Sequence, residues 1–296
     1  MGATADPELL GGRYALRRAI GSGGMAQVHA ADDLETGEAV AVKLLREPVE
    51  SGTLDRRLLQ ELLAAAQVRH PNLVGVIDFG IDAATQRPFF VMELLHGDDL
   101  AVHLAREGAC DAETFIPLFC GALDGLDAVH RVGIIHKDIK PPNLFMDWRI
   151  PSRPRLRVMD FGIAHQMQRS RITQEGGLAC TPRYTAPEYL TRSEVLQASD
   201  VYQMGLVLAE ALLGWTMVED GPFATVAYAH VRGELRFPPR LKGSPVGQVL
   251  ARALARDPRE RFPSAGAFAH ALRQLDLATA GAAVELNAAL YQRPSA

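Results

Sequence analysis

The chain has 296 residues, 48% of them hydrophobic and 22% charged, which is the composition of a soluble globular protein with one large domain or two lobes. Its 31 Lys and Arg nearly balance 35 Asp and Glu, and the net charge of −4 argues against nucleic acid as an obligate partner. The three cysteines fit neither a disulfide framework nor a metal site, and no segment is apolar enough to span a membrane, so we expect a cytoplasmic protein.

The first ninety residues contain five short apolar runs that predict β-strands. These runs are "RYALRRAI", "AQVHAADD", "EAVAVKLL", "LVGVIDFG" and "RPFFVMEL". Between the third and the fourth, residues 53–70 have apolar residues at helical spacing. This part of the chain is therefore expected to be a mostly antiparallel sheet with one helix.

The pattern changes after "HGDDL", and helical patterning dominates from Ala198 on. Residues 111–132 predict a long amphipathic helix in which Pro117 marks or kinks the first turn. Further helices are predicted over 199–214, 222–232, 244–256 and 264–275. An Ala-rich tail follows residue 276 and is expected either to form a terminal helix or to fray.

A glycine-rich segment, "AIGSGGMAQV", lies between the first two predicted strands. Backbone N–H groups of such a hairpin can approach phosphate oxygens, although an ordinary glycine-rich turn is the alternative. A dinucleotide-binding fingerprint is excluded because a strand, not a helix, follows the glycines.

Lys43 lies in the middle of the apolar strand "AVAVKLL". A buried ammonium needs an acidic partner or a phosphate, and Glu61 on the predicted helix is the natural partner. The alternative is an edge-strand lysine whose amine reaches water.

The segments "HKDIKPPN" and "VMDFG" combine the polar groups that phosphoryl transfer needs. Asp138 can accept the proton of an attacking hydroxyl, and Lys140 can balance charge on the transferring group. Asn143 and Asp160 offer hard oxygen ligands of the kind that Mg²⁺ prefers. A chance conjunction of these residues in this order is improbable.

Together with "VAVK", "TPRYTAPE" and "SDVYQMG", these segments resemble the eukaryotic-like (Hanks-type) protein kinases, and most of all their bacterial serine/threonine branch. The resemblance covers residues 12–276. It implies an α+β, bilobal protein-kinase fold, with a small β-rich N-lobe containing one main helix and a larger, mostly helical C-lobe. The expected boundaries are a leader (1–11), the N-lobe (12–92), a hinge (93–97), the C-lobe (98–276) and the tail (277–296).

The resemblance implies transfer of the γ-phosphoryl group of ATP to Ser or Thr hydroxyls of protein substrates, with autophosphorylation (EC 2.7.11.1 type). The implied catalytic residues are Asp138, Lys140, Lys43, Glu61 and Thr181, and the ligands for Mg²⁺, or for Mn²⁺ as a substitute, are Asn143 and Asp160. The implied nucleotide-binding residues are Ile20, Gly21, Ser22, Gly23, Gly24, Met25, Ala26, Val28, Ala41, Lys43, Met92, Glu93, Leu95, Asn143, Phe145 and Asp160.

The resemblance also implies structural roles outside the catalytic set. Glu188 is expected to pair with Arg261, Asp200 to brace the catalytic loop, and His136 to be a packing residue. The ribose is expected to meet Asp98 or Asp99.

The sequence departs from the family pattern at Lys137, where an arginine usually reads a phosphate on the activation loop. We therefore expect less dependence on phosphorylation of that loop, where Ser170 and Thr173 are candidate acceptors. Residues 147–157 form a basic insertion that predicts an extended hairpin loop, and Cys180 replaces a usual glycine.

Two other functions compete with this interpretation. A pseudokinase-like nucleotide-binding scaffold would keep the fold without turnover, but none of the catalytic groups is missing. An aminoglycoside-kinase-type phosphotransferase would lack the "TPRYTAPE" segment and its Arg261 partner. The sequence leaves open the physiological substrate, the upstream signal and the oligomeric state.

Overall fold

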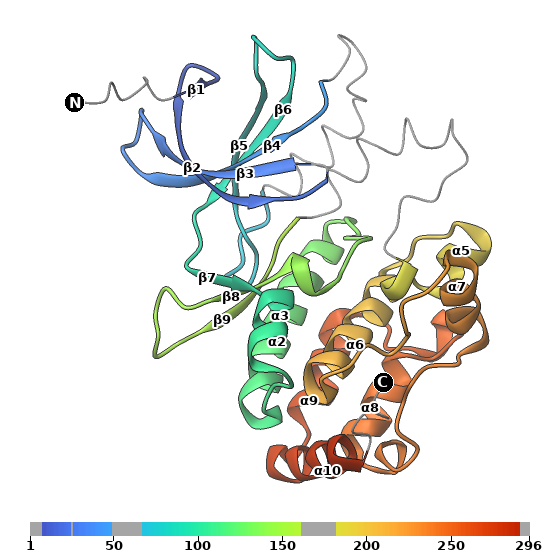
Figure 1. Cartoon of the computed structure of the whole chain (residues 1–296). Helices are drawn as coiled ribbons and strands as arrows, with labels where there is room; N and C mark the ends of the chain where they lie inside the picture. The colour runs from blue at the N-terminus through green and yellow to red at the C-terminus, as the bar shows by residue number, and fades with distance from the viewer. Residues whose placement is uncertain (1–7, 25, 49–66, 161–181, 291–296) are drawn as a thin grey trace. The chain divides into compact units, whose positions relative to one another are not determined.

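The computed structural model describes residues 8–24, 26–48, 67–160 and 182–290, with side chains to residue 285 (Figure 1). The chain divides into two compact units. Within the described residues, the first unit comprises 8–48 and 67–69 together with 74–96, and the second comprises 70–73, 97–160 and 182–290.

The first unit is built on a six-stranded antiparallel sheet of order β1-β2-β3-β4-β6-β5. Its strands are β1 (Leu9–Leu10), β2 (Tyr14–Ser22), β3 (Ala26–Asp33), β4 (Ala39–Leu45), β5 (Val76–Ile81) and β6 (Pro88–Glu93). Each of the five apolar runs therefore forms a strand, which confirms that expectation. The predicted helix at 53–70, with Glu61, lies almost wholly outside the described residues.

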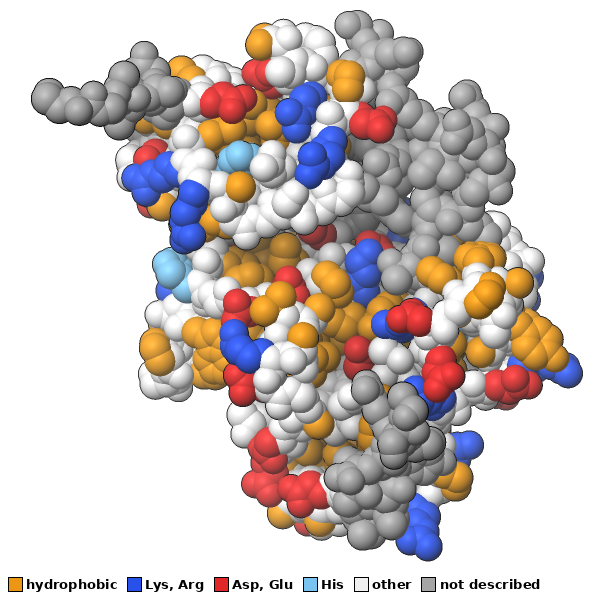
Figure 2. Space-filling view, in the orientation of Figure 1, with side chains coloured by type: hydrophobic (Ala, Val, Ile, Leu, Met, Phe, Trp, Pro, Cys, Tyr) orange, Lys and Arg blue, Asp and Glu red, His pale blue; other side chains and the backbone are white. Residues whose placement is uncertain are grey.

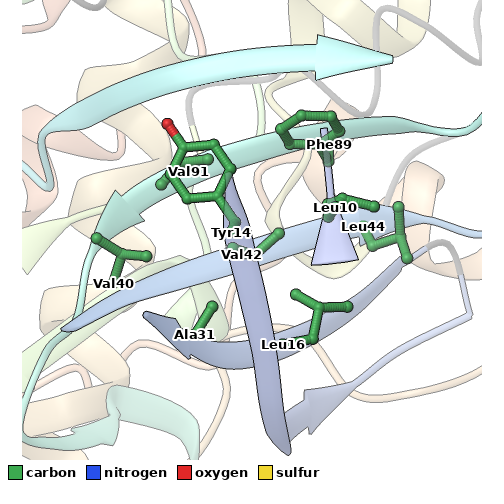
Figure 3. Close-up of a cluster of buried hydrophobic side chains, with 9 residues drawn as sticks. All are labelled: Leu10, Tyr14, Leu16, Ala31, Val40, Val42, Leu44, Phe89 and Val91. Carbon is green, nitrogen blue, oxygen red and sulfur yellow. The ribbon is translucent and has the colours of Figure 1, made fainter. Parts of the chain in front are cut away.

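One face of this sheet is covered by a cluster of buried apolar side chains (Figure 3). Alternate residues of β4 supply Val40, Val42 and Leu44, as the two-residue period of a strand requires. Tyr14, a member of the cluster, packs edge-on against Phe89 and donates its hydroxyl to Asp78 at 2.6 Å. Because β4 uses every second residue for this cluster, the intervening Ala41 and Lys43 point to the opposite face.

The second unit combines a three-stranded sheet with helices. Its strands, in the order β7-β8-β9, are β7 (Gly97–Asp99), β8 (Leu144–Asp147) and β9 (Arg155–Val158). The helices are α2 (Leu100–Glu107), α3 (Ala112–Arg131), α5 (Pro187–Arg192), α6 (Gln197–Leu213), α7 (Phe223–Arg232), α8 (Pro245–Ala253), α9 (Ala265–Arg273) and α10 (Leu277–Leu290).

Two helices, α3 and α6, form the core of the second unit. Nearly every residue of α6 is buried, and Phe119 of α3 packs edge-on against Phe268 of α9. Asp111 caps α3 by accepting a hydrogen bond from the Thr114 N–H at 2.8 Å. Pro117 lies inside α3, which runs on through it to Arg131, so the proline does not mark the start of this helix.

The remaining helical expectations are confirmed within a few residues at each end, and the tail contributes α10. Sequence patterns missed the short helices α2 and α5. Among the described residues, no helix has the length and hydropathy needed to cross a membrane. The two described cysteines, Cys110 and Cys120, are free thiols.

Candidate active site

The loop between α3 and β8 brings three of the predicted functional side chains together. Lys140 Nζ lies 2.9 Å from Asp138 Oδ2, and the amide nitrogen of Asn143 donates to the same oxygen at 3.1 Å. Asn143 also donates to the backbone carbonyl of Asp138 at 2.6 Å. Two donors therefore hold Oδ2, whereas Oδ1 receives no hydrogen bond from any described residue.

Asp200 of α6 holds the backbone of this loop in place, as the sequence predicted. Its carboxylate is fully buried and accepts from the backbone N–H groups of His136 at 2.8 Å and Lys137 at 2.9 Å. His130 of α3 lies 2.7 Å from the same carboxylate. The carboxylate thus holds the backbone of the two residues that precede Asp138.

Gln203, one turn along α6 from Asp200, is a positioning residue that sequence reasoning missed. Its amide oxygen accepts from the Ile139 N–H at 3.1 Å, and its amide nitrogen donates to the Lys137 carbonyl at 3.4 Å. The side chain therefore holds the backbone on both sides of Asp138. The i, i+3 spacing from Asp200 places both on one helix face, which was a usable signal.

Asp160 follows β9, and the preceding residue, Met159, connects it to the loop. The Met159 N–H donates to the Asn143 carbonyl at 3.0 Å, and a ring nitrogen of His136 lies 2.9 Å from the Met159 carbonyl. His136 is fully buried, in agreement with its expected packing role. The first contact holds the residue before Asp160 against Asn143, although Asp160 lies seventeen positions further along the chain.

Two non-glycine residues at this site have left-handed backbone conformations, Lys137 at φ 72° and Asp160 at φ 60°. Such conformations cost about 1 kcal/mol or more and persist where surrounding contacts enforce them. Here the Asp200 bond to Lys137 is one such contact. The strained residues are therefore Asp160, a predicted metal ligand, and Lys137, which directly precedes Asp138.

Glu188 and Arg261 form the buried ion pair that the sequence predicted. Two guanidinium nitrogens lie 2.9 and 2.8 Å from the two carboxylate oxygens, and both side chains are almost completely inaccessible. Burial alone would raise the pKa of Glu188, but Arg261 and the Ser199 hydroxyl outweigh it and the pKa lies below its ordinary value.

A groove of about 1030 Å³ lies beside the catalytic loop, entirely within the second unit. Lys140 and two prolines of the loop form one wall, and Leu104 of α2 and Leu213 of α6 contribute apolar surface. Tyr184 donates its hydroxyl to Glu210 at 2.6 Å in the lining. Burial raises the pKa of Glu210 despite this bond.

In the first unit, strand register places predicted nucleotide-binding residues on one face of the sheet. Val28 pairs with Lys43 across β3 and β4, Ala41 pairs with Met92 across β4 and β6, and Gly21 pairs with Val28. Directly paired residues in antiparallel strands point to the same side. All five therefore lie on the face opposite the apolar cluster of Figure 3.

Comparison with known proteins agrees with this geometry. The family model described as the protein kinase domain matches residues 14–272. The chain belongs to the protein kinase family. It is 35% identical over 282 residues to a probable serine/threonine-protein kinase PknB of Bifidobacterium longum, and 35% identical over 269 residues to the serine/threonine-protein kinase PknB of Mycobacterium tuberculosis.

These alignments cover 90% and 88% of this chain but only 40% and 42% of the two relatives, so the chain spans less than half of their length. Among solved structures, the Mycobacterium tuberculosis PknI kinase domain matches with a TM-score of 0.70 over 92% of this chain and 99% of that chain. At 24% identity this match shows the fold. The bilobal kinase fold expected from the sequence is therefore confirmed.

The glycine-rich loop of this kinase domain is a tight hairpin between β2 and β3. The Gly23 N–H donates to the Ala26 carbonyl at 2.9 Å. Arg46, at the end of β4, donates to the Gly23 carbonyl at 3.0 Å and to the Ser22 hydroxyl at 2.8 Å. Sequence reasoning missed Arg46, because nothing in its local pattern distinguishes it from an exposed arginine.

For the remaining expected site residues of the kinase domain, the structure shows only some of the partners and positions. Glu93 donates its N–H to the Gly75 carbonyl at 3.2 Å, so this N–H is not available to a nucleotide. Asp98 pairs with Arg106, and Asp99 caps α2, which gives both acids structural partners. Ile20 and Leu95 lie in the first unit, and Phe145 lies in β8. The expectations for Met25, Glu61, Ser170, Thr173, Cys180 and Thr181 fall outside the described residues.

Proposed function

We propose that this chain is an active protein kinase domain that transfers the γ-phosphoryl group of ATP to Ser or Thr hydroxyls of protein substrates, and to its own. The observation that carries the proposal is the arrangement of Asp138, Lys140 and Asn143 on a loop held by Asp200. Backbone strain that is enforced by surrounding contacts is typical of functional sites, which favours turnover over a scaffold.

Asp138 is the group proposed to receive the substrate proton. With Oδ2 held by Lys140 and Asn143, Oδ1 has the lone pairs to accept from a Ser or Thr hydroxyl. The hydroxyl oxygen forms the new bond to the γ-phosphorus, the bond to the bridging oxygen breaks, and ADP leaves. Lys140 places positive charge beside the transferring group.

Asn143 and Asp160 fit a divalent cation. The Asn143 amide nitrogen donates to Asp138, which leaves the amide oxygen as the atom that can bind a cation. Mg²⁺, or Mn²⁺ in its place, would be held by this oxygen and the Asp160 carboxylate, and would neutralise phosphate charge when bound. The protein's own part is to keep the two oxygens beside Asp138.

The nucleotide is proposed to lie on the sheet face that carries Gly21, Val28, Ala41, Lys43 and Met92. Val28 and Ala41 would contact the base, and Lys43 would hold phosphate oxygens. The hairpin bonds from Arg46 to Ser22 and Gly23 would fix the glycine-rich loop above the phosphates.

Protein substrates are proposed to occupy the groove beside Lys140. Its volume and mixed lining suit an extended peptide segment that presents its hydroxyl to Asp138. Because ATP is an intracellular metabolite, we propose that the domain works on the cytoplasmic side, without nucleic acid as a partner.

Lys137 leads to a proposal about regulation. Lysine offers a point charge where a bidentate arginine would read a loop phosphate, so we expect most of the activity to survive dephosphorylation. The check is the rate of peptide phosphorylation before and after phosphatase treatment. A loss of more than about tenfold would contradict the proposal.

The function is tested by label transfer from γ-labelled ATP with Mg²⁺, on wild type beside Lys43→Met and with a generic protein substrate. We expect labelled Ser or Thr in wild type and none in the variant, whose thermal unfolding should match wild type. Nucleotide binding without any labelling by wild type would overturn the proposal in favour of the scaffold.

A further inference from the structure

The hairpin between β8 and β9 presents an apolar and basic surface that phosphoryl transfer does not use. Residues 148–155 contain Arg149, Arg153 and Arg155 and no acidic residue. Trp148 and Ile150, two large apolar residues on one short turn, expose 36% and 50% of their surface. Hydrophobic side chains reach the surface over this hairpin in Figure 2. We call residues 148–155 the hairpin surface.

The hairpin surface stands on a rigid base. Arg157 of β9 is buried and its guanidinium donates to Asp147 at 3.3 Å and to the Leu73 carbonyl. The Asn72 amide donates to the Leu156 carbonyl at 2.9 Å, and the Arg153 N–H closes the turn on the Ile150 carbonyl at 2.9 Å. A partner would therefore meet a preorganised turn and would not have to order a loose one.

The Trp148 side chain packs against neighbouring residues and does not project freely from the hairpin. Its ring tilts against His103 of α2 with 6.4 Å between ring centroids. Gly97 passes so close that an added Cβ would lie 2.9 Å from Trp148 Cδ1 and 1.9 Å from the Met146 carbonyl oxygen. The glycine thus permits a contact that covers most of the indole and leaves about a third exposed.

The charges of the hairpin surface are available to a partner. Among the described residues, neither Arg153 nor Arg155 has an ion pair, and both side chains are exposed. Asp147, the acid at the base of the hairpin, is buried and is occupied by Arg157 and the Arg149 N–H. The surface is therefore positive around an apolar centre.

We propose that the hairpin surface docks a peptide segment of a partner protein in which acidic residues surround one apolar residue. The apolar residue would cover Trp148 and Ile150, and the acids would meet Arg153 and Arg155. A lipid surface fits less well, because insertion needs side chains that reach about 5 Å or more into the bilayer, whereas the Trp148 ring lies against Gly97 and His103.

The test measures binding of a fluorescein-labelled peptide pool, in which Asp or Glu surrounds one Leu, Ile or Phe, by fluorescence anisotropy. Arg153→Gln/Arg155→Gln should weaken binding about tenfold. Glutamine is chosen because Arg155 pairs in register with Asp147, where a glutamate would add a like charge. Ile150→Ser should weaken binding severalfold through lost apolar contact.

The matched control is Arg232→Gln/Arg240→Gln, which removes two exposed arginines elsewhere in the second unit and should leave affinity unchanged. Wild-type affinity should also fall with added salt. Absence of peptide binding, equal loss in the control, or variant-sensitive binding only to phosphatidylserine vesicles would overturn the proposal. The readout needs no ATP, so its failure is distinguishable from failure of the proposed kinase activity.

Discussion

The loop proposed to carry catalysis and the sheet face proposed to bind the nucleotide are positioned by different physical means. The loop is held by polar groups, since Asp200 and Gln203 bond four backbone atoms around Asp138. The sheet face is held by register, because β4 packs its alternate residues into the apolar cluster and leaves Lys43 on the other side. Removing a polar side chain that holds the loop should therefore impair catalysis. Reducing the volume of a side chain on the sheet face should weaken nucleotide affinity.

The largest effect expected is on the stability of the second unit, which contains the loop. Arg261→Ala leaves the Glu188 carboxylate buried without its partner and should lower the free energy of unfolding by about 3–5 kcal/mol. Chemical denaturation of wild type and variant measures the difference.

Arg259→Ala is the matched control, because Arg259 lies two residues away and pairs with Asp257 at the exposed surface. It should change stability little. Equal losses in the two variants would show that burial of the Glu188 pair has no special role.

A pH effect should follow from His230, which is fully buried and whose Nδ1 lies 2.8 Å from the Tyr202 hydroxyl. Burial lowers the pKa of His230 from 6.5 to about 4. The unfolded chain then binds the proton more readily, so stability should fall as the pH falls from about 6.5 to about 4, by up to about 3 kcal/mol.

Denaturation across this range should show a shallower pH dependence in His230→Gln than in wild type. An identical dependence in both proteins would rule out His230 as its source.

A smaller effect is expected from Gln203→Leu, which removes both bonds that hold the backbone around Asp138. We expect a loss of about 1 kcal/mol in stability and a fall of about tenfold in kcat with KM for ATP unchanged. Steady-state kinetics at varied ATP would separate the two constants. A rise in KM for ATP alone would contradict the positioning role.

The smallest effect is expected from Val28→Ala on the sheet face. Removing apolar surface that would contact the base should raise KM for ATP severalfold, by about 1 kcal/mol, with kcat nearly unchanged. If kcat falls as much as in Gln203→Leu, the proposed division between sheet and loop is wrong.

The sequence predicted the sheet of the first unit well, because apolar alternation and turn residues are local signals. It also predicted Glu188–Arg261 and the Asp200 brace, both of which depend on a family resemblance and not on periodicity. The short helix α2 was missed because eight residues contain too few turns to establish a period.

Other features of the site have no local signal at all. The left-handed backbone of Lys137 and Asp160 is imposed by contacts from residues distant in sequence. Arg46 is an ordinary strand-end arginine until the fold brings it to the glycine-rich turn. The hairpin was expected from residues 147–157, but the packing of Trp148 on Gly97 required the structure.

The measurement that tests the account most directly is phosphoryl transfer by Asp138→Asn beside wild type, with nucleotide affinity determined on the same samples. The substitution keeps the shape of the side chain but removes the proton acceptor. We expect a loss of at least about 10²-fold in rate, with unfolding temperature and ATP affinity close to wild type. A variant that folds normally and transfers phosphate at the wild-type rate would contradict it.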